Sequence, residues 1–143
     1  MDWKNYEMRI KTTNKRKGNE MSTKKIYWKV VRNHRGSACV WETNKFYIWY
    51  NKGDIIEAPK GTGGFFCFKT RQAARAFKHG LGYGNGHKIL RILSLGETRQ
   101  KNLISGRCTE IDIEHFWSGK LDNTFYARSP NKTVLLSRGM VID

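Results

Sequence analysis

The sequence lacks the features that mark membrane proteins and secreted disulfide-bonded proteins. No apolar run approaches the ~18 residues of a membrane span, and the first residues do not form a secretory signal. The three cysteines, Cys39, Cys67 and Cys108, are odd in number and have no CxxC spacing, so neither a disulfide framework nor a zinc knuckle is indicated. We therefore expect an intracellular protein with reduced cysteines.

Several catalytic signatures are also absent. No GxxxxGK[ST] loop occurs, and no pair of histidines has HxxxH or HExxH spacing. The glycine-rich stretch 80–86 lacks GxGxxG spacing and follows an expected helix instead of opening one. Glu110, Asp112 and Glu114 alternate as on one strand face, which predicts a solvated edge more readily than acid–base chemistry. We assign no catalytic residue, no metal site and no cofactor, and we expect a non-enzymatic protein.

Acidic residues are scarce: the chain has 12 Asp and Glu against 27 Lys and Arg, a formal charge of +15 at pH 7. Residues 1–25 carry 8 basic and 3 acidic side chains, residues 26–96 carry 12 and 3, and residues 97–143 carry 7 and 6. Most of the excess thus lies among strand-like and helix-like segments and not in a basic tail. The distribution predicts a folded basic face and an anionic partner.

Length and periodicity predict one α+β domain over residues 26–143, after a flexible basic leader over residues 1–25. Short runs of aromatic and β-branched residues, separated by turn residues, predict a mostly antiparallel, twisted sheet. The expected strands are 26–32, 37–42, 45–50, 55–58, 65–68 and 87–95, with weaker signals at 102–106, 110–117 (strand or short helix) and 133–142 (terminal strand or hairpin).

One main helix is expected over about residues 70–79. Thr70 has N-cap chemistry. At 100° per residue, with Arg71 at zero, Arg75 falls at about 40° and Lys78 at about 340°, while Ala73, Ala74 and Phe77 fall between roughly 200° and 300°, so a basic and an apolar face are opposed. This basic face is compatible with a solvated surface or with phosphate binding, and the sequence leaves both open. Together with cations beside two glycine-rich loops, it gives the predicted phosphate-binding set: Lys60, Lys69, Arg71, Arg75, Lys88 and Arg91.

Glycine-rich loops and aromatic rings complete the predicted site. Loops 60–64 and 80–86 bring backbone N–H groups within reach of an anion, and the predicted contacts are Gly63, Gly64, Gly84 and Gly86. Aromatic residues alternate with cations in the first half of the chain, which suits stacking on a nucleobase. Most of these rings are expected in the core of a two-sided sheet, and the predicted base-stacking residues are Tyr47, Trp49 and Tyr83.

The stretch from Tyr27 to Gly96 resembles a set of short phage-encoded proteins. The matching pieces are YWKVVR, the Tyr-x-x-Gly of YNKG, EAPKGTGGFFCFKT, the helix AARAF and ILRILSLG, and they cover about half of the chain. The resemblance implies a phage setting and the host bacterial cytoplasm, but no activity. Phages encode small proteins that counter host immunity, some of which sequester signal nucleotides, so a counter-defence role is implied by analogy.

A fainter resemblance is to the ADP-ribosyltransferase fold, in which a Gly-aromatic strand ending in Ser or Thr leads into a helix, as in GGFFCFKTRQAARAF. That family also has an early Arg or His and a late catalytic Glu. Here the resemblance offers Arg32 and either Glu110 or Glu114, although the spacing departs from the family pattern and Glu110-Ile111-Asp112 only approximates a Glu-x-Glu. This enzyme class is a remote alternative.

The sequence leads to three functional hypotheses. The first is a non-enzymatic phage protein that binds a phosphate-bearing nucleotide, cyclic nucleotides included, and sequesters a host immune signal in a pocket that a homo-oligomer could share. The second is a phage DNA- or RNA-binding protein in which the same cations form an open stripe. The third is an inhibitor of a host enzyme. A closed basic cavity would favour the first hypothesis, and a continuous exposed stripe the second.

Overall fold

The large sheet has seven strands in the order β2-β9-β4-β1-β3-β8-β5, and every pairing in it is antiparallel. It belongs to a computed structural model that describes residues 24–81 and 86–143. The expected α+β class with a mostly antiparallel sheet is confirmed. The strands are β1 (Ile26–Arg32), β2 (Ile55–Glu57), β3 (Phe65–Phe68), β4 (His87–Ser94), β5 (Thr98–Gln100), β8 (Thr133–Leu136) and β9 (Arg138–Val141).

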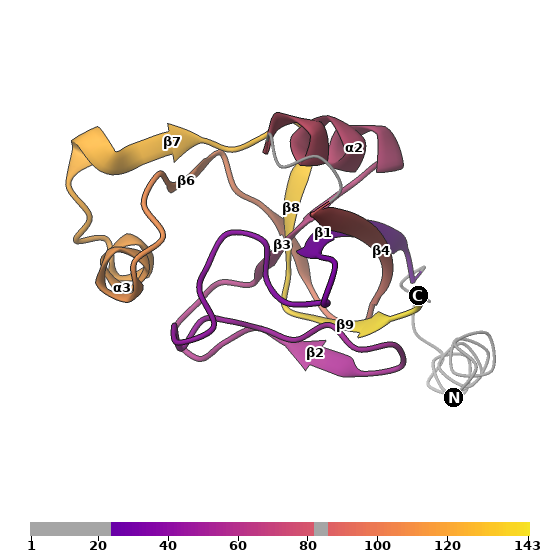
Figure 1. Ribbon diagram of the computed structural model, residues 1–143. Helices are drawn as coiled ribbons and strands as arrows, with labels where there is room; N and C mark the ends of the chain where they lie inside the picture. The colour runs from indigo at the N-terminus through magenta and orange to yellow at the C-terminus, as the bar shows by residue number, and fades with distance from the viewer. Residues whose placement is uncertain (1–23, 82–85) are drawn as a thin grey trace, which may run out of the picture.

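Two helices and a small second sheet flank the large one. Helix α2 (Arg71–Gly80) packs on β1, β3 and β4. Helix α3 (Glu110–Ser118) and the pair β6 (Leu103–Ser105) and β7 (Tyr126–Arg128), with the short 3-10 helix η1 (Asn123–Phe125), form a lobe to one side of the sheet (Figure 1). We call residues 101–130 the lobe. No helix in the described part of the chain has the length and hydropathy of a membrane span.

The large sheet closes on itself because β8 and β9 are separated by a single residue, Ser137. Strand β8 pairs with β3, and β9 pairs with β4, while β3 and β4 both pair with β1. These four pairings, together with the chain link from β8 to β9 through Ser137, form a ring, β1-β3-β8-β9-β4, which we call the barrel. At the bend, the backbone of Ser137 donates to Glu97 (3.1 Å) and accepts from Ala58 (2.9 Å), so β5 and β2 are anchored beside it.

Two apolar cores follow from the alternation of side chains along β1. Tyr27 and Val31 point into the barrel, where they pack with buried residues of β3, β4, β8 and β9. Val30 points the other way and packs with Phe68 and Ala74 under α2. The same alternation places Lys29 inside the barrel, where its Nζ donates to the carbonyl oxygen of Phe66 at 2.6 Å.

The segment between β1 and β2 differs from the prediction. The strands expected over 37–42 and 45–50 are wrong, because the described residues there pair only through the isolated bridges Val31–Ser37 and Gly36–Trp49. The reason is local: the Ser37 hydroxyl accepts from the N–H of Ile48 (2.8 Å) and donates to its carbonyl oxygen (3.2 Å). The N–H of Ile48 thus binds a side chain, and its carbonyl oxygen is shared between the Ser37 hydroxyl and the Ser37 backbone N–H (3.0 Å), so the backbone pairing stays incomplete.

The C-terminal third of the chain corrects two further expectations. Residues 110–118 form a helix, the second of the two alternatives for that stretch, so the idea that Glu110, Asp112 and Glu114 alternate on a strand face is wrong. Thr109 caps α3 by accepting a hydrogen bond from the N–H of Asp112, whose carboxylate in turn contacts the Thr109 hydroxyl. The strand or hairpin expected over 133–142 is two strands, β8 and β9, that do not pair with each other.

Candidate nucleic-acid interface

Helix α2 presents one apolar and one basic face. Thr70 caps it, with its hydroxyl accepting from the N–H of Ala73 at 3.1 Å. Ala74 is fully buried and packs with Ala73 and Phe77 against the sheet, whereas Arg71 and Arg75 are exposed. The predicted opposition of apolar and basic faces is therefore confirmed, and the helix contains no acidic residue.

The cations of α2 have no acidic neighbours to neutralise them. Residues 58–96 contain seven Lys and Arg and no Asp or Glu. None of the side chains of Lys69, Arg71, Arg75 and Lys78 forms an ion pair with an Asp or Glu of the described chain. We call these four residues the α2 stripe. Because their charges are unpaired within residues 24–81 and 86–143, they are available to an external anion.

A second group of cations and rings adjoins the last turn of α2. Arg32 lies opposite His87 in the β1–β4 register, and Lys78 of α2 lies near the same histidine. Burial, followed by the positive charges of Arg32 and Lys78, lowers the pKa of His87 below its ordinary value. The Arg32 guanidinium also lies 5.2 Å from the centre of the Trp41 ring, which is 73% exposed. A cation and an exposed indole thus continue the α2 stripe.

Trp49 and Tyr47 form an aromatic pair next to this group. Their ring centres are 5.2 Å apart in an edge-on arrangement, and Trp49 is 5.3 Å from His34 on its other side. Tyr47 covers Gly36 so closely that a Cβ there would lie 1.6 Å from the tyrosine hydroxyl oxygen. Burial is the main cause that raises the pKa of Tyr47. Tyr47 therefore packs over Gly36, whereas the Trp49 ring is 46% exposed and accessible from solvent.

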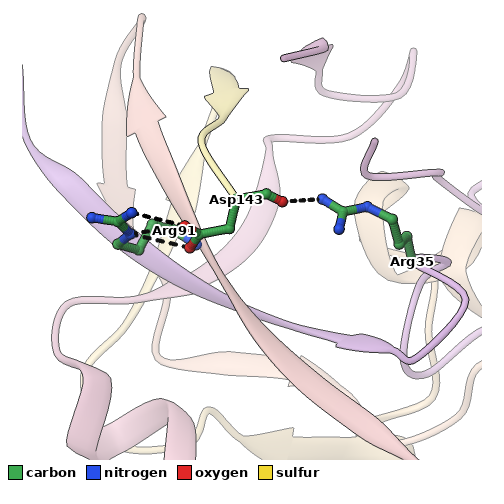
Figure 2. Close-up of polar contacts among 3 residues, drawn as sticks. All are labelled: Arg35, Arg91 and Asp143. Atoms are coloured by element: carbon green, nitrogen blue, oxygen red, sulfur yellow. Dashed lines mark hydrogen bonds and ion pairs between the residues drawn. The ribbon is translucent and has the colours of Figure 1, made fainter. Parts of the chain in front are cut away.

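Arg91, one of the predicted phosphate-binding residues, is engaged by the protein itself. Its guanidinium binds both carboxylate oxygens of Asp143, with the closest contact at 2.8 Å (Figure 2). Arg35 holds the same residue from the other side, donating to the backbone oxygen of Asp143 at 2.5 Å. The hydrogen bonds from Arg91 lower the pKa of the Asp143 carboxyl. Two arginines are thus used to fix residue 143 against β4.

The predicted phosphate-binding set does not gather at one place. Lys69, Arg71 and Arg75 belong to the α2 stripe, but Lys60 precedes β3 and Lys69 follows it, so the strand separates them. Lys88 pairs with Val31 and lies on the face of β4 that points away from α2. Arg71 and Arg75, one turn apart on α2, therefore share one surface, and Lys69 lies just before that helix.

The predicted glycine contacts lie apart as well. Gly63 adjoins Trp117, where an added Cβ would meet the indole at 2.9 Å. Gly64, with φ +146°, is buried against Leu135 and Leu136. The carbonyl oxygen of Gly86 accepts from Asn33 at 3.1 Å. Gly84 and the predicted stacking residue Tyr83 lie outside the described residues.

Two cavities show where a small ligand could enter. One, of about 230 Å³, is lined almost entirely by apolar side chains between the barrel and the lobe. The other, of about 450 Å³, lies at the N-terminal end of α2, and Lys132 is its one charged lining residue. None of the six predicted phosphate-binding cations lines either cavity. The cations of the α2 stripe instead lie on the convex surface of a helix.

The residues suggested by the ADP-ribosyltransferase resemblance have other partners. Glu110 accepts a hydrogen bond from the backbone N–H of Lys45 (2.6 Å), and Glu114 forms an ion pair with the Lys45 ammonium group. Both lie on a helix. Among residues 24–81 and 86–143, no group of three or more His, Cys, Asp or Glu could hold a metal ion.

Sequence reasoning missed three residues of this surface: Arg32, Trp41 and Lys78. Lys78 falls near Arg71 in the helical projection, and Trp41 belongs to the run in which rings alternate with cations, so both signals were present. The contact of Arg32 with Trp41 depends on how the loop after β1 folds back, which no local pattern specifies.

Comparison with known proteins gives no relative from which a function could be transferred. No protein-family model matches the chain, and no curated protein or solved structure is significantly similar to it. The function must therefore be inferred from the charges and contacts of this chain.

Proposed function

We propose that this chain is a non-enzymatic protein that binds single-stranded nucleic acid, with phosphates along the α2 stripe and bases stacked on Trp41 and Trp49. The observation that carries the proposal is the continuity of the surface. Unpaired cations follow α2 from Arg71 to Lys78, and Lys69 precedes the helix. Arg32, beyond its last turn, lies against the exposed indole of Trp41.

The charges suit a polymer better than a small enclosed ligand. Arg71 to Lys78 spans seven residues, or roughly 10 Å of helix, along a convex surface. Such a row can contact successive phosphates, and the contacts release counterions from the strand. A sequestered nucleotide would instead need cations around a recess, and neither cavity described above is lined by the predicted cations.

The exposed rings favour a single strand over a duplex. Stacking of a base on an aromatic side chain contributes ~1–3 kcal/mol per base and requires no particular sequence. Trp41 has an exposed ring face and a cation beside it, which is the combination that single-strand binders use. Bases in a duplex are already stacked on each other and are not available to these rings.

The phage setting and the counter-defence role rest on the resemblance of residues 27–96 alone. Within that setting, the proposed activity is to cover single-stranded DNA or RNA in the infected bacterium. The nucleotide-sequestering hypothesis remains a prediction, and the titration described next tests it with the same protein samples.

The experiment is a fluorescence-anisotropy titration of the full chain against labelled single-stranded DNA, single-stranded RNA, duplex DNA and a panel of cyclic dinucleotides. The double variant Arg71→Ala/Arg75→Ala removes two cations of the α2 stripe. We expect it to weaken single-strand binding at least tenfold. The plot of the logarithm of the binding constant against the logarithm of salt concentration should become shallower by about 1.4, since each of the two lost phosphate contacts contributes about 0.7 to its steepness.

A matched control removes the same charge elsewhere. Arg99→Ala/Arg138→Ala also deletes two exposed arginines, each ion-paired on the surface of the sheet with Glu97 or Glu57. It should bind nearly as the wild type does, and Trp41→Ala should weaken single-strand binding with the salt slope unchanged. Equal losses in the two double variants would show that only net charge matters and would overturn the proposed interface. Tight binding of a cyclic dinucleotide without polymer binding would favour the sequestering hypothesis.

A further inference from the structure

The apolar cavity between the barrel and the lobe is a second, chemically different site. Its walls come from the barrel, the lobe, the loops of residues 37–50 and 59–64, and Phe77 of α2. Aromatic rings dominate the lining, among them Phe46, Phe65, Phe66, Phe68, Phe116 and Trp117. A cavity of about 230 Å³ with such walls is a poor place for water and a good one for an apolar group.

The Ser and Thr hydroxyl groups in the cavity wall already form hydrogen bonds within the protein. The Ser and Thr hydroxyls of the lining all donate to backbone carbonyl oxygens, at 2.5 to 3.2 Å: Ser37, Thr62, Ser105 and Thr133. A base or sugar placed here would lose its hydrogen bonds to water and would find these donors occupied. The part of a ligand inside the cavity is therefore hydrocarbon.

One charged side chain belongs to the lining, and it is Arg107. It is exposed, its guanidinium lies 4.1 Å from the centre of the Phe125 ring, and it forms no ion pair with an acid of the described chain. The nearby carboxylates of α3 are bound elsewhere, Glu110 and Glu114 by Lys45 and Asp112 by Thr109. An anionic group at this position would meet a cation without an acid partner.

We propose that this cavity binds a small amphipathic carboxylate, with its hydrocarbon tail among the aromatic rings and its carboxylate on Arg107. The tail would have roughly six to ten carbons, because an apolar cavity of about 150 Å³ accepts a six-carbon ring. A planar guanidinium binds a carboxylate through two parallel hydrogen bonds, which fixes the head group at the mouth of the cavity. The site is independent of the α2 stripe.

The test is isothermal titration calorimetry of the full chain with acetate, hexanoate, octanoate and decanoate, and with octanol as the uncharged match to octanoate. Affinity should rise about fourfold for each buried methylene until the cavity is full. Arg107→Gln should weaken octanoate about tenfold and leave octanol unchanged. Lys101→Gln is the matched control, because Lys101 lies in the lobe over the Phe116 ring (5.1 Å) but does not line the cavity.

A second variant tests the cavity without touching the charge. Ile113 is half-buried in the lining, and Ile113→Trp should fill the space and abolish binding of both octanoate and octanol while circular dichroism remains that of the wild type. Absence of octanoate binding at millimolar concentration would overturn the proposal, as would equal effects of Arg107→Gln and Lys101→Gln. Arg71→Ala/Arg75→Ala should bind octanoate normally, so this proposal and the proposed function fail separately.

Discussion

Within the described residues, helices α2 and α3 use charge in opposite ways. Helix α3 carries Glu110, Asp112 and Glu114, and the protein itself binds all three, through Lys45 and Thr109. Helix α2 carries Arg71, Arg75 and Lys78 of the α2 stripe, and none of these is paired with an acid of the described chain. Both helices begin at a threonine cap, so the contrast does not come from how they start.

The contrast separates charges that build the fold from charges that face outward. The α3 carboxylates tie the lobe to the loop after β1, across more than sixty residues of sequence. The α2 cations contribute nothing comparable to internal contacts and crowd one exposed face, where they repel each other. A protein keeps such an arrangement when an external anion neutralises it, and this is the physical basis of the proposed interface.

The largest expected effect comes from placing a charge at a buried position of α2, compared with an exposed position of α3. Ala74→Glu places a carboxylate under α2 at a fully buried position, and we expect it to lower the free energy of unfolding by about 3 kcal/mol or more. Ile111→Glu on α3, at a position 59% exposed, should change it by about 0.5 kcal/mol or less. Urea denaturation followed by circular dichroism measures both.

Ala76→Glu is the control within α2, because Ala76 is exposed on the same helix. If Ala76→Glu destabilised the chain as strongly as Ala74→Glu, helix propensity or charge would explain the loss, and the assignment of a buried α2 face would be wrong.

An intermediate effect is expected for Lys29. Unlike the paired acids of α3 and the exposed cations of α2, this lysine lies inside the barrel without an acidic partner among the described residues. Burial lowers the pKa of Lys29 because it disfavours the charged form in the folded chain, so the charged lysine costs stability below that lowered pKa, and the cost falls away as pH rises toward the unfolded value. Lys29→Met should raise the free energy of unfolding by about 1 kcal/mol at pH 7. The gain should shrink as pH rises through the lowered pKa of Lys29 toward its unfolded value.

The comparison with wild type must be made at each pH, because two neighbours act in the opposite direction. Burial raises the pKa of Cys67 to about 12 and that of Tyr50 well above its ordinary value, so both destabilise the fold in alkali. A stability difference between Lys29→Met and wild type that stays constant from pH 7 to 10 would contradict a buried, charged Lys29.

The smallest effects concern the two caps. Thr70→Ala and Thr109→Ala should each lower the free energy of unfolding by about 1 kcal/mol. The loss at Thr109 should be the larger, because its hydroxyl also contacts the Asp112 carboxylate. Ser118→Ala, at the other end of α3, should have almost no effect in the same urea titration. Equal losses at Thr70 and Thr109 would show that this extra contact stabilises nothing.

Much of the fold could be predicted because most of its strands have a local pattern of residue types that is typical of strands. The runs 26–32, 65–68 and 87–94 are rich in apolar and β-branched residues, as strands with two covered faces require. The segment 37–50 shows the same residue types, but the Ser37 hydroxyl takes the N–H of Ile48 and limits the backbone pairing there. Residues 110–118 were ambiguous because acids at alternate positions suit either a strand face or a capped first helical turn.

The candidate site was predictable only where it lies on one element. Arg71 and Arg75 could be placed on the exposed face of α2 because helical geometry is local. The engagement of Arg91 by Asp143 spans 52 residues, and sequence gives no sign of it. The same holds for Arg107, which enters a cavity lining only when the lobe packs against the barrel.

The bend at Ser137 has a consequence for how the chain reaches this structure. Residues 133–141 form the two strands that connect β3 to β4 and close the barrel. During synthesis, the barrel therefore cannot close before these residues leave the ribosome. Until that segment emerges, Val31, Ile92 and the core residues around them remain exposed to water. Closure must then pair β8 with β3 and β9 with β4, which are distant in sequence. Assembly should therefore be a late, slow and all-or-none event.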